Sequence, residues 1–412
     1  MKLEKITAKE FENFSINHDL VTFHQRESWG KLKIKNGWNY ELLGLKDKNK
    51  IIGATLLLHK TMPLGIKMYY APRGYLIDFN DESMVKTFTQ EIKKYVKAHK
   101  GTFVKIDPYV IHKQRDINGN IVENGIDNTK IVKLLKKLEY KHHGFNIDTT
   151  KELQPRWMFR LNLKDKTEED LMKSMIKQTR KNVKKTLKLG LVLEEIGIEG
   201  LDEYKKITQH TGTRRGFIDR PISYYENMFK ELKDDIKIIL CYLDTEKSIS
   251  LLENEIKEIN GYSDITEARK KELKELEDKI SDINALSQKY GKKICLAGSM
   301  FISCGKEFLN LYGGGYDEFM KYNAMYAIQW HAIKYALNNG YEIYNFYGIE
   351  GNFKKENNPM YGVYEFKKGF GGEVVELIGE FDLIINKPKF LLYKVAFSSY
   401  KKIKNLINSI KK

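Results

Sequence analysis

Two stretches of the sequence place charged and phenolic side chains where they could act on a substrate. Asp107 directly follows an apolar run that predicts a strand over 103–106. A carboxylate at that place can cap a turn or accept a proton from an amine nucleophile. Arg220 lies four residues before Tyr224, so the two share one face if a helix begins at residue 221. An arginine and a phenol arranged in this way could clamp a phosphate.

A pair of adjacent lysines, Lys367 and Lys368, lies within "YGVYEFKKGFGGEVVELIGEFDL", residues 361–383. The alternation of aromatic and aliphatic residues predicts strands at 362–366 and 374–378. The two lysines are therefore either a solvated edge or a charge placed for chemistry. Neighbouring residues of an extended chain point in opposite directions, so we expect the two side chains to face different surroundings.

A further stretch, "KSMIKQTRKNVKKTLKLG" at 173–190, is dense in positive charge and belongs to a helix predicted over 168–189. Its cations recur every three or four residues and are Lys173, Lys177, Arg180, Lys181, Lys184, Lys185 and Lys188. Its apolar side consists of Met175, Ile176, Val183, Leu187 and Leu189. Ordinary solvated helices mix charges of both signs. We therefore favour a nucleic-acid backbone, contacted through its phosphates, as the partner of this basic ridge.

The composition indicates a basic globular protein. The chain has 71 Lys and Arg residues against 55 Asp and Glu, a formal net charge of +16. This excess favours a polyanionic partner, either nucleic acid, an anionic membrane surface or a phosphorylated substrate. A sequence that is lysine-rich throughout would carry the same excess without such a partner. No apolar run is long enough to span a membrane.

Strands and helices alternate along most of the chain, which predicts an α/β fold. A length of 412 residues is also too great for one ordinary core. We expect domain 1 over residues 1–153 and domain 2 over 154–245 and 291–386.

Residues 246–290 break this alternation, because they are nearly all charged or helix-forming. Apolar residues recur there at three- and four-residue spacing in two runs: Ile249, Leu252, Ile256 and Ile259, then Leu273, Leu276, Ile280 and Ile283. The turn signal "NGYSD" at 260–264 separates the runs. We expect an antiparallel helical hairpin, a coiled-coil arm inserted between neighbouring strands of domain 2.

Residues 387–412 predict a basic C-terminal helix with eight lysines and no acidic residue. A basic amphipathic helix can lie on an anionic membrane surface. It can equally dock on domain 2 and leave its lysine face solvated.

Standard catalytic signatures are missing from the sequence. It contains no phosphate-binding G-x-x-x-x-G-K-[ST], no G-x-G-x-x-G after a strand, no H-E-x-x-H and no G-x-S-x-G. We therefore expect neither a metal nor a cofactor. The N-terminus, "MKLEKITAKEFENF", is charged from its second residue and lacks the apolar stretch of a secretion signal, so we expect a cytoplasmic protein.

Six motifs, in order along nearly the whole chain, give the sequence a resemblance to the Fem-type peptidoglycan interpeptide-bridge aminoacyltransferases. They are "YAPRGYLIDF" (70–79), "VKIDPYV" (104–110), "TRKNVKKTLKLGL" (179–191), "TGTRRGF" (211–217), "NFYGIEGNF" (345–353) and the stretch 361–383. The resemblance implies two domains with mixed sheets, each similar to the acetyltransferase (GNAT) fold. It also implies transfer of an amino acid from aminoacyl-tRNA to the side-chain amine of the third stem-peptide residue of a peptidoglycan precursor.

The resemblance implies catalytic roles for two residues. Asp107 matches an aspartate near the acceptor amine, as proton acceptor or positioner. Lys367 matches a lysine near the aminoacyl ester, where its charge could offset developing negative charge. We then expect Lys367 to point from a strand end toward the substrates, and Lys368 to face solvent or tRNA.

The resemblance also implies substrate-binding residues. Lys33 and Arg220 correspond to positions that hold the diphosphate of the precursor, with Tyr224 beside them. Lys31 is two residues from Lys33 and equally basic. Tyr312 corresponds to a residue lining the peptide channel.

The implied partners are aminoacyl-tRNA, a lipid-linked precursor and, peripherally, the inner face of the cell membrane. A homo-oligomer or a hetero-oligomer with related transferases also fits the family. Glycine is the favoured amino acid, with alanine and serine as the other candidates. Two alternatives stay open: a tRNA- or acyl-CoA-dependent transferase of the same fold with another acceptor, and a non-catalytic RNA- or membrane-binding protein.

Overall fold

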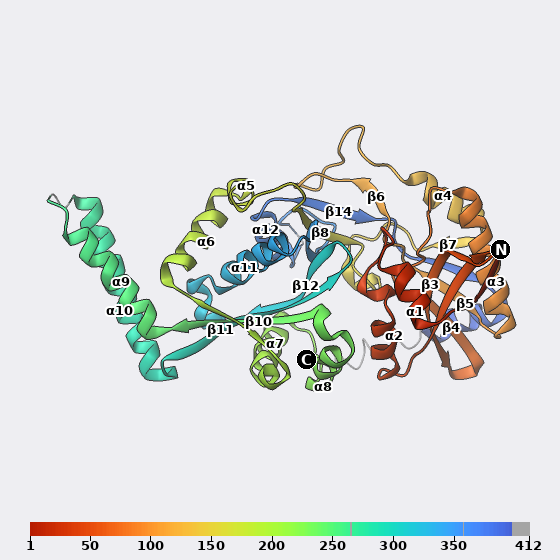
Figure 1. The fold of residues 1–412 in the computed structure, drawn as a ribbon, viewed down its shortest axis with the longest axis horizontal. Coiled ribbons are helices and arrows are strands. Elements are labelled where there is room, and N and C mark those ends of the chain that lie inside the picture. The colour runs from red at the N-terminus through yellow and green to blue at the C-terminus, as the bar shows by residue number, and fades with distance from the viewer. Residues whose placement is uncertain (264–265, 357, 398–412) are drawn as a thin grey trace. The chain divides into compact units, whose positions relative to one another are not determined.

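The computed structural model describes residues 1–263, 266–356 and 358–397, which form two compact units (Figure 1). Unit 1 comprises Met1–Phe159, Gly348–Tyr364 and the chain from Glu373 onward. Unit 2 comprises Arg160–Tyr347 and Glu365–Gly372. The predicted boundaries place all of 291–386 in domain 2, whereas two parts of that range, 348–364 and 373–386, belong to unit 1. They do so because strands near the C-terminus pair with strands of the first 150 residues.

Unit 1 contains a seven-stranded mixed sheet with the order β1-β2-β3-β4-β5-β15-β7. Its strands are β1 (Lys2–Lys5), β2 (Asn39–Asp47), β3 (Lys50–Met62), β4 (Ile66–Ala71), β5 (Phe103–Ile106), β7 (Tyr140–His142) and β15 (Phe381–Ile384). Strands β4 and β5 run parallel, and the other pairs are antiparallel. A second antiparallel pair joins β6 (Ile111–Gln114) to β14 (Glu373–Leu377).

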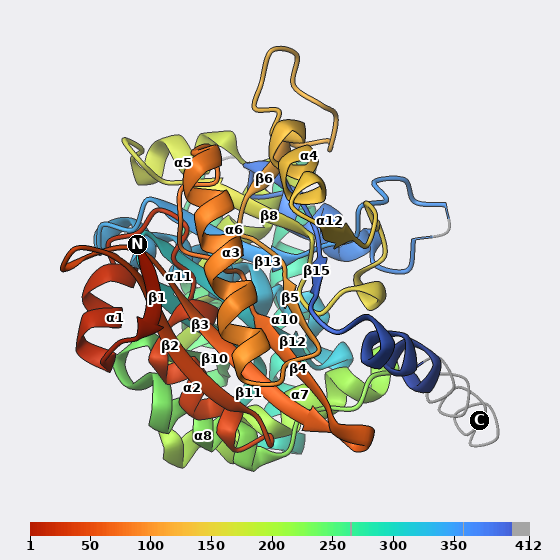
Figure 2. The ribbon, with the colours of Figure 1, turned by 90° about the vertical axis from the view of Figure 1, so that its right-hand side faces the viewer.

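Helices cover both faces of this sheet (Figure 2). On one face, α3 (Glu82–Ala98) and α4 (Thr129–Lys137) bury their apolar stripes against alternate residues of the strands, such as Leu43 and Leu45. On the other face lie α1 (Ala8–Ser15) and α2 (Glu27–Ile34), where Gly30 lets α2 approach the ring of Tyr40 closely. Short 3-10 helices in this unit are η1 (Phe23–Gln25), η2 (Pro63–Gly65) and η3 (Thr149–Lys151).

Unit 2 contains the strand order β13-β12-β11-β10-β9, in which only β12 and β13 are parallel. The strands are β9 (Val192–Ile196), β10 (Ile236–Asp244), β11 (Lys293–Cys304), β12 (Glu307–Gly315) and β13 (Ile343–Gly348), and the unit boundary falls within β8 (Trp157–Asn162). The predicted α/β class with two mixed sheets is thus confirmed.

The helices of unit 2 sandwich its strands. Their bounds are α5 (Glu168–Ser174), α6 (Lys177–Leu189), α7 (Leu201–Arg215), α8 (Ile222–Leu232) and α11 (Ala324–Asn338), with η4 (Ile198–Gly200), η5 (Lys233–Asp235) and η6 (Asp317–Tyr322). The unit boundary also falls within a further helix, α12 (Tyr361–Lys368). Gly298 of β11 faces α7, where an added Cβ would approach Ile207. Phe308 of β12 stacks on Phe301 and reaches Tyr335 of α11 on the opposite face.

An antiparallel helix pair, α9 (Thr245–Asn260) and α10 (Glu267–Tyr290), leaves unit 2 after β10 and returns to β11 (Figure 1). Leu252 and Ile259 of α9 and Leu276 and Ile283 of α10 are buried along the predicted seams. This is consistent with the predicted arm over 246–290. The arm is fastened to α6, because Ser248 donates a hydrogen bond to the carbonyl of Leu189 at 2.8 Å.

Two predicted elements differ from the structure. The helix predicted over 168–189 is two helices, α5 and α6, because Met175 and Ile176 adopt extended backbone and the Ile176 amide donates to the carbonyl of Gly369. The strand predicted over 362–366 is wrong, since α12 occupies it. The aromatic residues Tyr361 and Tyr364 also fit helical spacing, and Tyr364 is the side chain that becomes buried.

Residues 387–397 are helical, and the rest of the predicted C-terminal helix over 387–412 lies outside the described residues. Among the helices that the structure describes, none combines the length and the apolar character that crossing a bilayer requires.

Candidate active site

Asp107 lies at the carboxyl end of β5 and is almost completely buried, with 2% of its surface exposed. Arg73 follows the neighbouring parallel strand β4, so both residues emerge at the same edge of the sheet. The backbone amide of Arg73 donates a hydrogen bond to Asp107 Oδ1 at 2.9 Å. The guanidinium Nη1 of Arg73 lies 3.5 Å from Asp107 Oδ2.

The surroundings of Asp107 shift the pKa of its carboxyl, so that the group can gain and lose a proton near neutral pH. Burial raises the pKa of its carboxyl to about 7, although Arg73 opposes this change, and the charge of Glu380 adds to it. Oδ2 of Asp107 is buried and has no hydrogen-bond partner among the residues that the structure describes. Asp107 therefore offers an oxygen atom that can accept a proton.

Arg73 is a candidate site residue that the sequence analysis does not single out. It is buried, adopts a left-handed backbone conformation with φ 57°, and donates from Nη2 to the carbonyl of Pro155 at 2.7 Å. A non-glycine residue with positive φ is uncommon and is often held at a functional site. Arg73 lies within the motif "YAPRGYLIDF", but nothing in the sequence links it to Asp107.

Lys33 belongs to the same neighbourhood of unit 1. Burial, then the charges of Arg73 and Lys33, hold the pKa of His24 well below its ordinary value, so both cations lie near that imidazole. The Nζ of Lys33 lies 4.1 Å from the centre of the Trp29 ring. Lys31, the alternative to Lys33, is exposed and pairs with Glu27 at 3.0 Å.

Lys105, which is buried, precedes Asp107 by two residues. Its Nζ lies 2.9 Å from Glu380 Oε2 and 3.1 Å from Asp382 Oδ1. Burial opposes protonation, but the two carboxylates raise the pKa of Lys105. Lys105 is therefore held as a cation by its partners.

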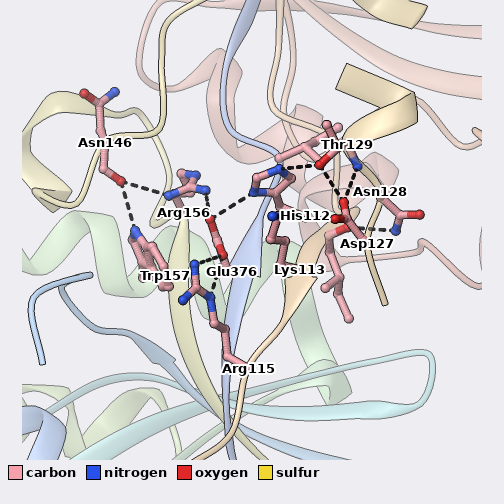
Figure 3. Close-up of polar contacts among 12 residues, drawn as sticks. His112, Lys113, Arg115, Asp127, Asn128, Thr129, Asn146, Arg156, Trp157 and Glu376 are labelled. Carbon is pink, nitrogen blue, oxygen red and sulfur yellow. Dashed lines mark hydrogen bonds and ion pairs between the residues drawn. The ribbon is translucent and has the colours of Figure 1, made fainter. Parts of the chain in front are cut away.

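Glu376 is the centre of a separate charged cluster in unit 1 (Figure 3). Its Oε2 accepts from Arg115 Nε at 2.7 Å, and its Oε1 contacts Arg156 Nη2 and His112 Nδ1, the latter at 3.0 Å. Burial opposes ionisation, but the hydrogen bond from His112 and the charges of Arg156 and Arg115 hold the pKa of Glu376 at about 2. Both oxygens of Glu376 are occupied, so this cluster ties together β6, β14 and the start of β8.

In unit 2, Lys367 lies in the last turn of α12 and its Nζ donates to the carbonyl of Tyr347 at 3.2 Å. Burial lowers the pKa of Lys367 to about 7. Lys368 is one residue further along the helix and pairs with Glu365 at 3.4 Å. The two lysines therefore differ in surroundings, but as neighbours on a helix and not as opposite faces of a strand.

Tyr347 connects Lys367 to the other predicted residues of unit 2. It has a positive φ of 65° and was not singled out from the sequence, although it lies in the motif "NFYGIEGNF". Burial, then the neighbouring Tyr312, raises the pKa of Tyr224, and Tyr347 contributes in the same direction. The guanidinium of Arg220 lies 5.4 Å from the centre of the Tyr224 ring. The structure thus brings Arg220 and these aromatic residues into one neighbourhood.

The predicted RNA-binding cations lie on α6. Lys177, Lys181, Lys184 and Lys185 are exposed and Arg180 is half-buried, and within the described chain none of them forms an ion pair. The predicted apolar side is partly wrong, because Ile176 and Leu187 are exposed. The buried side of α6 is Thr179, Val183 and Thr186. Small residues are needed there, since Gly369 approaches Thr179 closely.

The described residues contain no group of three or more His, Cys, Asp and Glu side chains able to hold a metal ion. Apart from the cations of α6, the predicted site residues divide between the two units. Lys33 and Asp107 lie in unit 1, and Arg220, Tyr224, Tyr312 and Lys367 lie in unit 2.

Comparison with known proteins identifies the family of the chain. The model of the FemAB family matches residues 6–398. The chain is 32% identical to the aminoacyltransferase FemA of Staphylococcus epidermidis, covering 96% of this chain and 98% of that protein. It is 31% identical to FemA of Staphylococcus aureus over 99% of this chain and 100% of that one.

A solved structure shows the same fold. The crystal structure of FemX covers 95% of this chain and 99% of its own, with a TM-score of 0.79 and 27% sequence identity. The chain belongs to the FemAB family and is an aminoacyltransferase of the Fem type.

Proposed function

We propose that this enzyme transfers an amino acid from aminoacyl-tRNA to the side-chain amine of the third stem-peptide residue of a lipid-linked peptidoglycan precursor, which builds an interpeptide bridge. Glycine is the proposed amino acid, with alanine and serine as the other candidates. The observation that carries the proposal is the buried carboxyl of Asp107, whose Oδ1 is fixed by the Arg73 amide and whose pKa is raised by burial to about 7. The similarity to FemA and FemX supports it.

The reaction requires no external activation, because the aminoacyl ester is already reactive. The amine nitrogen attacks the ester carbonyl, a C–N bond forms, and the C–O bond to the terminal ribose of the tRNA breaks. The proton that the amine loses balances the proton that the ribose oxygen gains. An enzyme accelerates these steps by orienting the amine, accepting its proton and stabilising the oxyanion.

Asp107 is the proposed proton acceptor. A general base works best when its pKa lies near the working pH, and the pKa of Asp107 meets that condition. Its Oδ2 atom is the proposed acceptor, and the Arg73 amide that binds Oδ1 fixes the carboxylate.

Lys367 is the proposed oxyanion-stabilising group. In its protonated form the ammonium offsets the negative charge that develops on the ester carbonyl oxygen. Low solvation strengthens this interaction. The hydrogen bond to the Tyr347 carbonyl orients the amine of Lys367.

The remaining residues bind the two substrates. Arg220 with Tyr224, and Lys33 in unit 1, are proposed to contact the diphosphate of the precursor, and Tyr312 its peptide. The cations of α6 are proposed to contact the tRNA backbone: the exposed Lys177, Lys181, Lys184 and Lys185, and the half-buried Arg180.

The test is an assay of the purified protein with a lipid-linked precursor and tRNAs charged with glycine, alanine or serine. We expect the mass of the precursor to increase by one glycine residue. An unchanged mass with all three tRNAs, or transfer from an acyl-CoA instead, would overturn the proposal.

A further inference from the structure

The segment that joins α7 to α8 presents apolar side chains to solvent. Phe217 is 52% exposed and Ile218 is 97% exposed. Single apolar residues on a surface are common and need no explanation. These two are adjacent and lie in the middle of the segment 214–220, between Arg215 and Arg220.

The tip, Phe217 and Ile218, is held by hydrogen bonds on both sides. The amide of Phe217 donates to the carbonyl of Gly212 at 3.0 Å, and Gly216, which caps the C-terminus of α7, has a left-handed conformation. On the other side of the tip, the carboxylate of Asp219 accepts from Thr208 at 2.8 Å and from Tyr225 at 2.7 Å. Both ends of the tip are thus anchored to α7 and α8.

Positive charge frames the apolar tip. Arg214 and Arg215 precede it and Arg220 follows it, and all three are exposed. Arg214 pairs with Asp317, whereas Arg215 and Arg220 form no ion pair within the described chain. The one acidic residue of the segment, Asp219, is turned inward and paired with Lys205.

This combination fits the surface of an anionic membrane. Apolar side chains gain free energy by entering the boundary between headgroups and acyl chains, and each arginine near that surface is attracted by anionic headgroups. RNA is a poorer fit, because single-stranded RNA is bound by stacking on aromatic rings, and Ile218, the more exposed of the two residues, provides no ring.

The position of the tip agrees with the proposed substrate, on which this inference partly rests. Arg220 is a proposed ligand of the precursor diphosphate and lies two residues after Ile218. The diphosphate of a lipid-linked precursor lies at headgroup depth, since its lipid tail lies in the bilayer. A residue adjacent in the chain to Arg220 must then lie close to the same surface.

We propose that residues 214–220 are a membrane-docking loop, in which Phe217 and Ile218 enter an anionic lipid surface and Arg214, Arg215 and Arg220 contact its headgroups. The loop holds the enzyme peripherally at the surface that carries its acceptor.

The first test measures binding of the full chain to vesicles of phosphatidylcholine and phosphatidylglycerol in equal parts, without precursor. We expect Ile218→Asp to weaken binding at least about tenfold and Arg215→Gln to weaken it about fivefold. The matched control is Ile198→Asp, because Ile198 is 57% exposed but lies beside Glu199. Its binding should equal that of the wild type. Failure of the wild type to bind, or equal loss in the control, would overturn the loop assignment.

The second test separates the loop from the catalytic proposal. With a water-soluble, nucleotide-linked precursor as acceptor, Ile218→Asp should transfer at the wild-type rate, whereas with precursor in vesicles its rate should fall about tenfold. Absence of transfer by the wild type to either acceptor would contradict the proposed function, and not the vesicle binding. If Ile218→Asp binds vesicles normally but loses affinity for tRNA or changes the oligomeric state, the loop binds RNA or a second copy and the proposal is wrong.

Discussion

Asp107 and Glu376 are both buried carboxylates of unit 1, yet burial has opposite outcomes for them. Glu376 is surrounded by His112, Arg115 and Arg156, which hold its pKa at about 2. Asp107 has one nearby cation, Arg73, and burial raises its pKa to about 7. The difference shows that the number of donors around a buried carboxylate decides whether it is a fixed charge or a group that can exchange a proton.

Two lysines, the buried Lys105 and the half-buried Lys367, show the same contrast. Lys105 lies between Glu380 and Asp382, which raise its pKa. Burial lowers the pKa of Lys367 to about 7. We therefore expect Glu376 and Lys105 to contribute to stability, and Asp107 and Lys367 to the reaction.

The largest expected effect is the loss of activity in Asp107→Asn. The amide has nearly the same shape but cannot accept the amine proton, so kcat should fall by a factor of about 10² to 10⁴. The measurement is single-turnover transfer to the precursor with saturating charged tRNA. A thermal unfolding midpoint no lower than that of the wild type is the control for folding. A variant with full activity would remove Asp107 from the mechanism.

Glu376→Gln should instead lower the free energy of unfolding, by about 3–5 kcal/mol, because Arg115 and Arg156 would lose the charge that compensates them. Urea unfolding followed by circular dichroism measures this loss. Asp107→Asn is the matched comparison and should not destabilise the protein at neutral pH. Equal destabilisation by the two variants would contradict the contrast between the two carboxylates.

The pH dependence of stability should identify Asp107 directly. Its pKa is about 7 in the folded state against an ordinary 3.8, so the folded state binds the proton more tightly. The resulting stability is fully present below pH 3.8 and is lost as the pH rises to about 7. Over this window the wild type should lose on the order of 3 kcal/mol relative to Asp107→Asn. Parallel curves for the two proteins would show that the pKa of Asp107 is not raised in the folded state.

Lys367→Arg tests the role of the Lys367 ammonium through the pH dependence of kcat/KM. Asp107 is ionised and Lys367 is protonated at the same time only near pH 7. A plot of kcat/KM against pH should therefore be bell-shaped for the wild type and fall about tenfold per pH unit on the alkaline side. Arginine stays protonated, so the alkaline fall should disappear while the acidic fall remains. If the alkaline fall persists in the arginine variant, a different group titrates there.

The smallest effect is expected on α6, where paired and unpaired cations can be compared on one helix. Lys181 forms no ion pair in the described chain, whereas Lys188 pairs with Glu255. Lys181→Gln should weaken tRNA binding a few-fold and reduce the slope of log affinity against log salt by about 0.7 to 0.9. Lys188→Gln should change both much less. Identical behaviour of the two variants would show that this ridge does not contact phosphates.

Much of the local structure could be predicted from the residues. The strand 103–106 and the apolar seams of the arm follow from periodicity over a few residues. The stretch 361–368 was misassigned because its aromatic residues fit both the two-residue and the helical period. Only its packing, with Tyr364 buried, distinguishes a helix from a strand there.

The candidate site was harder to predict than the elements that carry it. Arg73 lies 34 residues before Asp107, and the two meet because β4 and β5 are parallel neighbours. Arg115 and Glu376 are 261 residues apart and meet through the pairing of β6 with β14. No pattern over a short stretch of chain indicates either contact.

The sequence by itself determined the net charge, the dense cations of α6, the position of Asp107 at the end of a strand and the motifs shared with the Fem-type enzymes. Those properties depend on residue type and on neighbours within a few positions. Only the tertiary structure decided that Asp107 and Lys367 have displaced pKa values whereas Glu376 and Lys105 are fixed charges. The physical reason is that desolvation and ion pairing depend on which distant segments surround a group, and folding alone brings those segments together.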